Sequence, residues 1–334
     1  MEDNFVVTNF IPFIIFIIII VLIIFVILYF LYFNNLNNNE CNAMTKLYGT
    51  INGSIIPLNT ADPNCSRNFC DYYIKTAYNA CSGGSYKNDF VNICNLENII
   101  KQGVRALDFE IFSLHDQPIV STSTSSNYNI KETYNSVPFL DIMKTIKNRC
   151  FSSDGSPNYT DPVIIHLRFQ SSNQSMYSNL SNILKQYDSI LLDRDYSFEN
   201  NRNLGSVKLL DLLGKIIIIV DRSNASFMDN PSFPEFVNMT SNSVYMRSFK
   251  FSDIQHIYDV TEMQEYNKTC MTIVLPNNIP NPVNPNTDIT RELGCQLTAM
   301  CFQNVDKHLQ ESNAFFDNCK YAFCLKPIKL QATT

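Results

Sequence analysis

The run Gly294-Cys-Gln-Leu-Thr-Ala-Met-Cys-Phe-Gln303, followed soon after by Asn318-Cys-Lys-Tyr-Ala-Phe-Cys-Leu-Lys-Pro327, is the part of the sequence that decides the fold. In each run a short, mainly apolar segment is bounded by residues that favour turns, which is typical of a buried strand. We therefore predict strands over Gln296–Phe302 and Tyr321–Leu325. Similar segments recur upstream, so we expect these two strands to be the last of a longer series of strands.

Strand-like and helix-like segments alternate through most of the chain. The runs Val104–Phe112, Pro162–Phe169 and Lys215–Val220 are almost continuously apolar, which favours strands of a parallel sheet buried on both faces. The alternation predicts an α/β fold, a TIM (βα)8 barrel, with its chemistry at the carboxyl ends of the strands. The other predicted strands are Cys70–Asn79, Pro118–Ser121, Val244–Phe249 and Met271–Leu275, and the predicted helices are Leu96–Gln102, Val137–Cys150, Asn173–Leu192 and a segment near Asp253–Tyr258.

A strongly hydrophobic segment precedes the barrel. Phe10–Phe33 contains no charged residue, and at 1.5 Å per residue it spans roughly 36 Å as a helix, enough for a bilayer core of ~30 Å. We predict an uncleaved single-pass transmembrane anchor. The alternative is a cleaved signal peptide, which has a basic start and a shorter apolar region of about 7–15 residues. No Lys or Arg precedes Lys46, so the orientation of the segment stays open.

Composition and charge narrow the classes of partner. Of the 334 residues, 45% are hydrophobic and 17% are charged, and the net charge is −6. A nucleic-acid partner would call for clustered Lys and Arg, so we predict none. The lipid membrane is the partner that the hydrophobic segment implies.

The chain has 11 cysteines, and no CxxC pair is matched by a second one, so a zinc site is not expected. Disulfides in an oxidising compartment are one interpretation, and buried free thiols are the other. On the first interpretation the barrel lies in a lumen, outside the cell or on a virion surface.

The two C-terminal runs closely resemble the end of the Y half of the barrel of eukaryotic-type phosphoinositide-specific phospholipase C, in the PLC-like phosphodiesterase superfamily. Upstream, Gly103-Val-Arg-Ala-Leu-Asp-Phe-Glu110, Asp161-Pro-Val-Ile-Ile-His-Leu-Arg168 and Lys215-Ile-Ile-Ile-Ile219 resemble strands of the X half. The resemblance runs in order from about Cys70 to Leu330 and implies a barrel of this type.

The resemblance and the composition together divide the chain into seven parts. These are an N-terminal tail (1–9), the transmembrane anchor (10–33), an Asn-rich tether and barrel lead-in (34–69), an X-like half (70–222), an X–Y linker (223–243), a Y-like half (244–330) and a C-terminal tail (331–334).

Members of the family cleave inositol phospholipids with two histidines and a Ca²⁺ held by Asn, Glu, Asp and Glu. The resemblance places Tyr78 and Thr122 at the two histidine positions. Asn79, Asp108 and Glu110 then match three of the calcium ligands, whereas Arg168 replaces the fourth. An arginine is permanently charged and pairs well with carboxylates, so we expect its guanidinium to take over the role of the cation.

Other family positions also differ. Ile219 and Asp221 align with phosphate-binding lysines, Ile273 and Leu275 align with a substrate-binding Arg-x-Tyr, and Ser248 keeps a substrate-binding serine.

Of the four histidines in the chain, His256 and His308 lie in helix-like and loop segments, which leaves His115 and His166 to weigh as substitutes for the missing pair. His115, in the loop after the second strand, is an outside candidate for a catalytic group. His166, two positions before Arg168, is expected to be a packing residue one layer deeper in the barrel.

The resemblance with these replacements predicts a membrane-anchored barrel that has lost catalysis and acts as a binding or structural membrane component. Tyrosine, with a pKa near 10, is a poor base at neutral pH, and loss of general acid–base catalysis costs about 10²–10⁴-fold. We expect no cofactor, with Ca²⁺ only if the ancestral site still works, and a phosphoinositide headgroup or a protein as a further partner.

Two other functions stay open. One is an active phosphoric diester hydrolase that acts on phosphatidylinositol lipids or a related phosphodiester by an altered mechanism. The other is a purely architectural protein of a viral or vesicle membrane.

Overall fold

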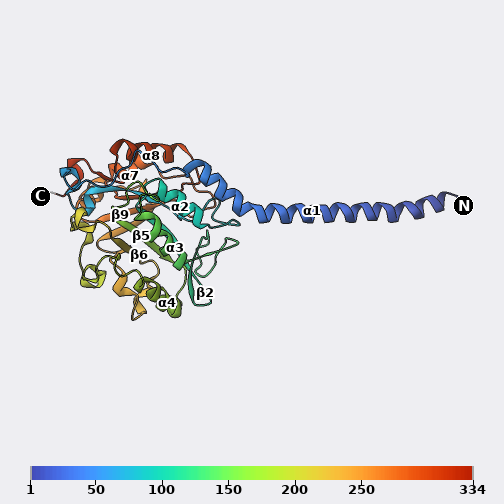
Figure 1. Cartoon of the computed structure of the whole chain (residues 1–334), viewed down its shortest axis with the longest axis horizontal. Coiled ribbons are helices and arrows are strands. Elements are labelled where there is room, and N and C mark those ends of the chain that lie inside the picture. The colour runs from blue at the N-terminus through green and yellow to red at the C-terminus, as the bar shows by residue number, and fades with distance from the viewer. Residues whose placement is uncertain (1, 333–334) are drawn as a thin grey trace.

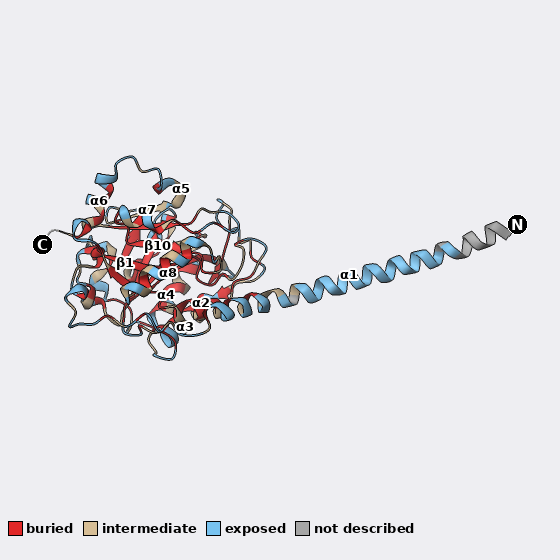
Figure 2. Cartoon of the chain, turned by 90° about the horizontal axis from the view of Figure 1, so that it is seen from above, coloured by how far each residue is buried: buried red, intermediate tan, exposed pale blue. Residues whose placement is uncertain are grey.

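The computed structural model describes residues 2–332, which form a barrel and one long helix that extends away from it (Figure 1). The helix, α1, is Glu2–Tyr48. Within the described residues it is the one helix long and apolar enough to cross a membrane. From Phe10 to Tyr32 its described side chains are exposed, and burial begins only where the helix meets the barrel (Figure 2).

Eight parallel strands form a nearly closed barrel, which confirms the predicted fold class. They are hydrogen-bonded in the order β7-β6-β5-β2-β1-β10-β9-β8, and β7 and β8, at the two ends of this order, lie in contact. The barrel strands are β1 (Tyr72–Ala77), β2 (Ala106–Leu114), β5 (Val163–Phe169), β6 (Ile216–Asp221), β7 (Met239–Ser241), β8 (Met246–Lys250), β9 (Met271–Leu275) and β10 (Leu297–Met300).

The outer elements are helices and three short strands. Antiparallel strands β3 (Gln117–Ser121) and β4 (Val137–Pro138) extend β2 into a hairpin, and β11 (Phe323–Leu325) pairs antiparallel with β1. The helices are α2 (Ile93–Lys101), α3 (Phe139–Thr145) with a π-helical turn at Ile146–Cys150, α4 (Gln174–Lys185), α5 (Phe251–Ile254), α6 (Val260–Thr269), α7 (Thr287–Glu292) and α8 (Lys307–Cys319).

Alternation along each strand separates two apolar layers. On β2, Leu107 and Phe109 face outward into a core shared with α2, α3 and α4, whereas Ala106 faces the barrel interior. Asp108 and Glu110 have the same parity as Ala106. They therefore point into the barrel, nearer to its carboxyl-terminal mouth.

The barrel strands differ from the predicted strands in two ways. Pro118–Ser121 and Tyr321–Leu325 are strands, but both pair antiparallel outside the barrel. The missing barrel strand is β7, inside the interval 223–243 that we interpreted as a linker. It has three residues, which is too short for a periodic pattern to reveal.

The interval 34–69, interpreted as an Asn-rich tether, also differs from the expectation. Residues 34–48 continue α1, and the segment 33–48, which we call the stem, packs against the barrel. Met44 and Tyr48 are buried there, and Tyr48 donates a hydrogen bond to the carbonyl of Phe302 at 2.8 Å. In the stem, every fourth residue from Glu40 to Tyr48 is buried, which is the spacing of one helix face. The many asparagines of this segment hid that pattern in the sequence.

Both interpretations of the cysteines hold in part. Disulfides join Cys41 to Cys94 and Cys319 to Cys324, and the first links the stem to α2. The remaining cysteines are free, and all except Cys270 are buried; they are Cys65, Cys70, Cys81, Cys150, Cys270, Cys295 and Cys301.

Candidate functional site

Inward-facing residues of neighbouring strands form the candidate site at the carboxyl ends of the barrel strands. The parallel register places Asp108 beside His166 and Glu110 beside Arg168 on the adjacent strands β2 and β5. Asn79 follows β1 with a φ of 42°, a left-handed conformation that asparagine tolerates better than most residues. All of these side chains except that of Arg168 are almost completely buried.

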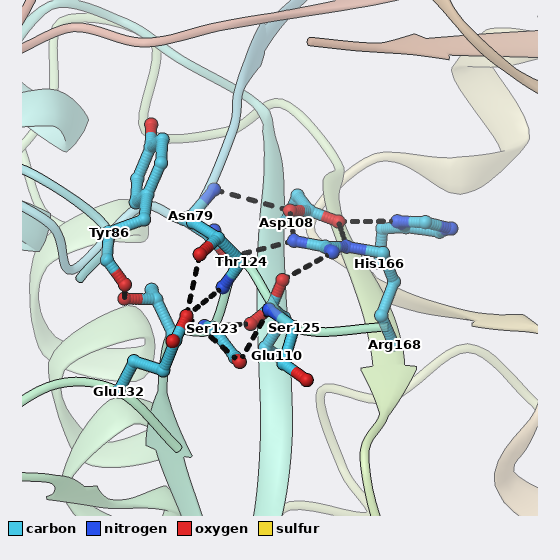
Figure 3. Close-up of polar contacts among 11 residues, drawn as sticks. Asn79, Tyr86, Asp108, Glu110, Ser123, Thr124, Ser125, Glu132, His166 and Arg168 are labelled. Atoms are coloured by element: carbon cyan, nitrogen blue, oxygen red, sulfur yellow. Dashed lines mark hydrogen bonds and ion pairs between the residues drawn. The ribbon is translucent and has the colours of Figure 1, made fainter. Parts of the chain in front are cut away.

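The Arg168 guanidinium connects the other residues (Figure 3). Its Nε and Nη2 donate to the two oxygens of Asp108, at 2.9 and 2.8 Å, and its Nη1 donates to Glu110 Oε1 at 2.6 Å. Nη2 also donates to Asn79 Oδ1 at 2.8 Å. The structure thus brings together the four residues that the sequence placed at a remnant metal site, and we call them the mouth network.

The electrostatics of the mouth network follow from burial and charge. Burial would raise the pKa of Asp108, but Arg168 and His166 hold it below its usual range. For Glu110 burial outweighs Arg168, so its pKa is raised. Burial would lower the pKa of Arg168, but the neighbouring charges, that of Asp108 above all, raise it well above its usual value. Arg168 therefore stays charged while it compensates two carboxyl groups.

His166 joins this network from one layer deeper, where we had expected a packing residue. Its Nδ1 lies 2.7 Å from Asp108 Oδ1, and its Nε2 lies 3.0 Å from the Oγ of Ser241 on β7. An aspartate, a histidine and a serine in this order match the spacing of a nucleophile, its base and an orienting carboxylate. However, Ser241 is fully buried and does not line the neighbouring cavity, so it cannot reach a substrate.

The two family histidine positions hold buried residues with structural contacts. The ring of Tyr78 packs edge-on against the ring of Tyr86, with 5.3 Å between the ring centres. The Arg168 guanidinium carbon lies 4.7 Å from the centre of the Tyr78 ring. Burial raises the pKa of Tyr78 well above its usual value, which makes it a still poorer base. Thr122 donates its hydroxyl hydrogen to the carbonyl of Tyr86 at 3.0 Å.

A loop after β3 covers Glu110 (Figure 3). The backbone N–H of Ser123 donates to Glu110 Oε2 at 2.8 Å, and the backbone and hydroxyl of Thr124 both donate to Glu132 Oε2 at 2.6 Å. Both oxygens of Glu110 are therefore engaged, one by Arg168 and one by the loop.

The mouth network does not fit a divalent cation. Calcium takes about six to eight oxygen ligands at roughly 2.3–2.6 Å. Here the inward oxygens of Asn79, Asp108 and Glu110 already accept hydrogen bonds from Arg168, whose guanidinium fills the space between them. Within residues 2–332, no group of three or more His, Cys, Asp or Glu is arranged to hold a metal.

A cavity of about 470 Å³ opens beside the mouth network. Tyr78 and Arg168 form part of its wall, and Ser248 lies on another part, together with Asp221 and Lys250. Ser248 thus lies at the cavity that adjoins the network, but it does not belong to the network itself.

His115 lies far from this site. It is an exposed residue with a φ of 49° in the turn between β2 and β3, seven positions beyond Asp108. At about 3.3 Å per residue this separation is roughly 23 Å along the strand, so the structure does not support His115 as a catalytic group.

Sequence reasoning missed Ser241 altogether and gave His166 the wrong environment. For His166 a signal existed in the sequence, because it lies two positions before Arg168 and so shares its inward parity. For Ser241 there was none, because the strand that carries it lies in an Asn-, Ser- and Pro-rich interval.

The family models of phosphatidylinositol-specific phospholipase C match almost the whole barrel. The X-domain model matches residues 65–222, and the Y-domain model matches residues 223–329. No match was found among curated proteins.

Solved structures share the barrel at low sequence identity. L. pealei PLC21 has a TM-score of 0.63 at 16% identity, covering 79% of this chain and 38% of that chain. S. officinalis PLC21 has a TM-score of 0.60 at 16% identity, covering 79% and 37%. A calcium-dependent phosphoinositol-specific phospholipase C from Pseudomonas sp. has a TM-score of 0.51 at 13% identity, covering 75% and 94%.

The chain spans less than two fifths of the length of either PLC21 protein. At these identities the structural similarity shows a shared fold, and the two consecutive domain models carry the assignment. From its sequence and its fold, this chain belongs to the phosphatidylinositol-specific phospholipase C family.

Proposed function

We propose that this chain is a membrane-anchored member of the family that does not hydrolyse phosphodiesters and whose barrel mouth serves to bind a ligand. The observation that carries the proposal is the position of the Arg168 guanidinium. It donates to Asn79, Asp108 and Glu110, the residues that the resemblance assigns to calcium. The cationic charge at the mouth is then supplied by the protein itself.

A fixed guanidinium is a poor substitute for calcium in catalysis. A metal ion can coordinate a phosphoryl oxygen directly and stabilise the charge that develops in the transition state. The Arg168 side chain is 12% exposed and is held by two carboxyl groups, so most of its charge is already compensated.

His166, the histidine nearest to the mouth network among the described residues, is not placed for proton transfer either. His166 is 1% exposed, and each of its ring nitrogens lies within hydrogen-bond distance of a protein oxygen. A general base has to come within hydrogen-bond reach of the proton that it removes, and His166 lies beneath Arg168 rather than in the cavity.

Helix α1 supports the membrane part of the proposal. Its apolar residues are exposed from Phe13 to Tyr32, and the helix continues without interruption into the stem. A signal peptide is removed at a cleavage site after a shorter apolar region. Exposed apolar side chains along a helix of this length are stable only in a lipid environment or against a partner.

The test is a hydrolysis assay on the full chain in nanodiscs containing phosphatidylinositol or its bisphosphate, with millimolar Ca²⁺ or with a chelator. We expect headgroup release no faster than from the matched variant Asp108→Asn. An active calcium-dependent relative, such as the Pseudomonas enzyme, serves as the positive control. Headgroup release that Asp108→Asn abolishes would overturn the proposal and favour an active hydrolase.

A further inference from the structure

Matches to the N-glycosylation pattern Asn-x-Ser/Thr occur at eight positions of the chain, and the structure places their asparagines in different environments. Because the chain is rich in asparagine, several matches are expected by chance, so the pattern alone identifies no site. A glycan is bulky and hydrated, and it needs an asparagine whose side chain is exposed and whose amide nitrogen is free. The eight asparagines are Asn52, Asn64, Asn158, Asn173, Asn179, Asn224, Asn238 and Asn267.

Seven of these asparagines are buried or held by the fold. A chain with a glycan on a buried asparagine could not adopt this fold, and four of the eight are buried, namely Asn158, Asn224, Asn238 and Asn267. Three more are partly exposed, but the amide nitrogen of each donates to a protein oxygen: Asn52 to Asp317 at 2.8 Å, Asn173 to Asp116 at 2.7 Å, and Asn179 to the carbonyl of Asp116 at 2.8 Å. A sugar on one of these nitrogens would compete with the contact that the nitrogen now makes.

Asn64 is exposed, and its backbone is fixed while its side chain is free. It lies in the short 3₁₀ turn Pro63–Cys65, ahead of β1. Its backbone N–H donates to Asp62 Oδ1 at 2.9 Å, and its carbonyl accepts from the Tyr72 hydroxyl at 2.8 Å. Its side-chain amide has no hydrogen-bond partner among the described residues. The nitrogen that would carry a sugar therefore faces solvent from a well-defined turn.

The other two residues of this match have a suitable arrangement. Cys65, in the middle, is 1% exposed and belongs to the core inside the barrel, so it anchors the turn. Ser66 is exposed, and its hydroxyl donates to the carbonyl of Pro63 at 2.8 Å. Both residues that the pattern requires, Asn64 and Ser66, thus lie at the surface on either side of a buried residue.

The disulfides point to the compartment in which N-linked glycans are added. One disulfide joins Cys41 of the stem to Cys94, and the other joins Cys319 to Cys324. Disulfides form and persist in oxidising environments such as the lumen of the endoplasmic reticulum, and proteins that pass through this compartment are the ones that receive N-linked glycans. A barrel on that side of the proposed anchor would expose Asn64 to the glycan transferase.

A glycan on Asn64 would leave the barrel mouth open. Tyr72, whose hydroxyl binds the Asn64 carbonyl, is the first residue of β1, whereas Asn79 of the mouth network follows the carboxyl end of the same strand. Asn64 is also not among the residues that line the cavity beside the mouth network. The modification is therefore compatible with ligand binding at the mouth.

We propose that Asn64 carries an N-linked glycan. In the transfer, Asn64 Nδ2 forms a bond to the anomeric carbon of an oligosaccharide whose donor is a polyprenyl diphosphate. The bond from that carbon to the diphosphate oxygen breaks, and the diphosphate leaves with the bonding electron pair. Nδ2 loses one proton to a base of the transferase. The inference concerns a modification of the surface and does not depend on the proposed function of the barrel mouth.

The test is expression of the full chain in insect cells, whose secretory pathway adds N-linked glycans, followed by treatment with peptide N-glycosidase. We expect the treatment to increase the mobility of the chain in a denaturing gel by one step. The enzyme converts a glycosylated asparagine to aspartate, so mass spectrometry of the peptides locates the site, and we expect this conversion at Asn64. No change in mobility, or conversion at other asparagines without conversion at Asn64, would overturn the proposal.

Variants of the pattern assign the glycan to this position. Asn64→Gln and Ser66→Ala each remove the acceptor pattern and should abolish the mobility change, whereas Ser66→Thr keeps the pattern and should retain the change. The control Asn173→Gln removes a partly exposed match whose amide is engaged, and it should leave the mobility change intact. Because the gel is denaturing, the readout does not depend on the stability of a variant. A mobility change that persists in Asn64→Gln, or that is lost in Asn173→Gln, would contradict the assignment.

Discussion

Arg168 determines the electrostatics of the barrel mouth because its planar group satisfies three neighbours at once. Asp108 and Glu110 are buried and two positions apart on one strand, so without a cation their charges would repel each other. A lysine at position 168 would bring one flexible ammonium group instead of a rigid fork with five donors. Glutamate at this position would restore an oxygen ligand and remove the cation.

Removal of Arg168 should therefore destabilise the barrel strongly. We expect Arg168→Ala to lower the free energy of unfolding by about 2–4 kcal/mol, because it leaves two buried carboxyl groups without their compensating cation. The control Arg149→Ala breaks an ion pair with Glu97 whose side chains are 44% and 31% exposed, and should cost less than about 1 kcal/mol. Denaturant unfolding of the solubilised chain measures both, and equal effects would show that the mouth network contributes no special stability.

The elements most visible in the sequence were those with long apolar runs. Lys215–Val220 and Pro162–Phe169 became β6 and β5 within a residue or so, because strands buried on both faces have little choice of side chain. β7 has only three residues, and its partners are set by the tertiary fold. Helix α6 was missed because it is largely polar and buries few of its residues.

The sequence predicted which residues form the mouth network, but it did not predict all of their hydrogen bonds. Inward parity placed Asp108, Glu110 and Arg168 on one face of two strands, and the register of those strands brought them into contact. The bonds of His166 depend on Ser241, which comes from a strand that the sequence did not reveal. To predict a contact between two strands, both strands and their register must be known. Here the sequence revealed β5, which carries His166, but not β7, which carries Ser241.

The stem is held to the barrel by a covalent bond as well as by packing. The Cys41–Cys94 disulfide closes a chain segment with a sequence separation of 53. In the loop-entropy description a disulfide of this span contributes about 4 kcal/mol, and engineered cases often give less. The Cys319–Cys324 disulfide spans only 5 positions and should contribute less.

Replacement of Cys41 and Cys94 by alanine should lower the free energy of unfolding by about 2–4 kcal/mol and increase hydrogen exchange in residues 33–48. The matched double variant at Cys319 and Cys324 should have a smaller effect and leave the exchange of the stem unchanged. Equal protection of the stem in both variants would mean that packing alone holds it.

Two neighbouring carboxyl groups, the buried Glu40 and the half-buried Asp89, make the stem contact sensitive to alkaline pH. Burial raises the pKa of Glu40 to about 9, and a hydrogen bond and charge repulsion from Asp89 add to the effect. Asp89 itself accepts from the backbone N–H groups of Ser85 and Phe90 at 2.6 and 3.1 Å. The native state therefore keeps a proton on Glu40 that the unfolded chain loses above its ordinary pKa of 4.5.

The contribution of Glu40 to stability is complete below about pH 4.5 and should decline as the pH rises to about 9. Glu40→Gln keeps the hydrogen bond without the ionisation, so we expect it to flatten this decline in thermal unfolding measured from pH 6 to 9.5. The control Glu199→Gln, at an exposed position, should keep the native slope. A native slope in Glu40→Gln would assign the pH dependence to other groups.

At the scale of the whole molecule, the proposed anchor and the barrel form one body, because α1 passes from its apolar segment into the stem without a break. If α1 crosses a membrane as proposed, this continuous helix would restrict the motion of the barrel relative to the lipid surface more than a flexible tether would. Ligand selection at the mouth would in this way take place close to the lipid surface.

Retention of the anchor is directly measurable. We expect N-terminal sequencing of the mature protein to begin before Phe10, and the protein to stay with the membrane pellet after alkaline carbonate extraction. A mature N-terminus beyond Phe33 would show instead that the apolar segment is a cleaved signal peptide.

The most direct test of the central claim, that Arg168 takes the place of a divalent cation, is a calcium titration of thermal unfolding. The native chain should have the same unfolding temperature with millimolar Ca²⁺ as with a chelator. Arg168→Glu should be less stable without calcium and should gain stability as calcium is added, by about 2.7 kcal/mol at a concentration 100 times the dissociation constant. Stabilisation of the native chain by calcium would contradict the account.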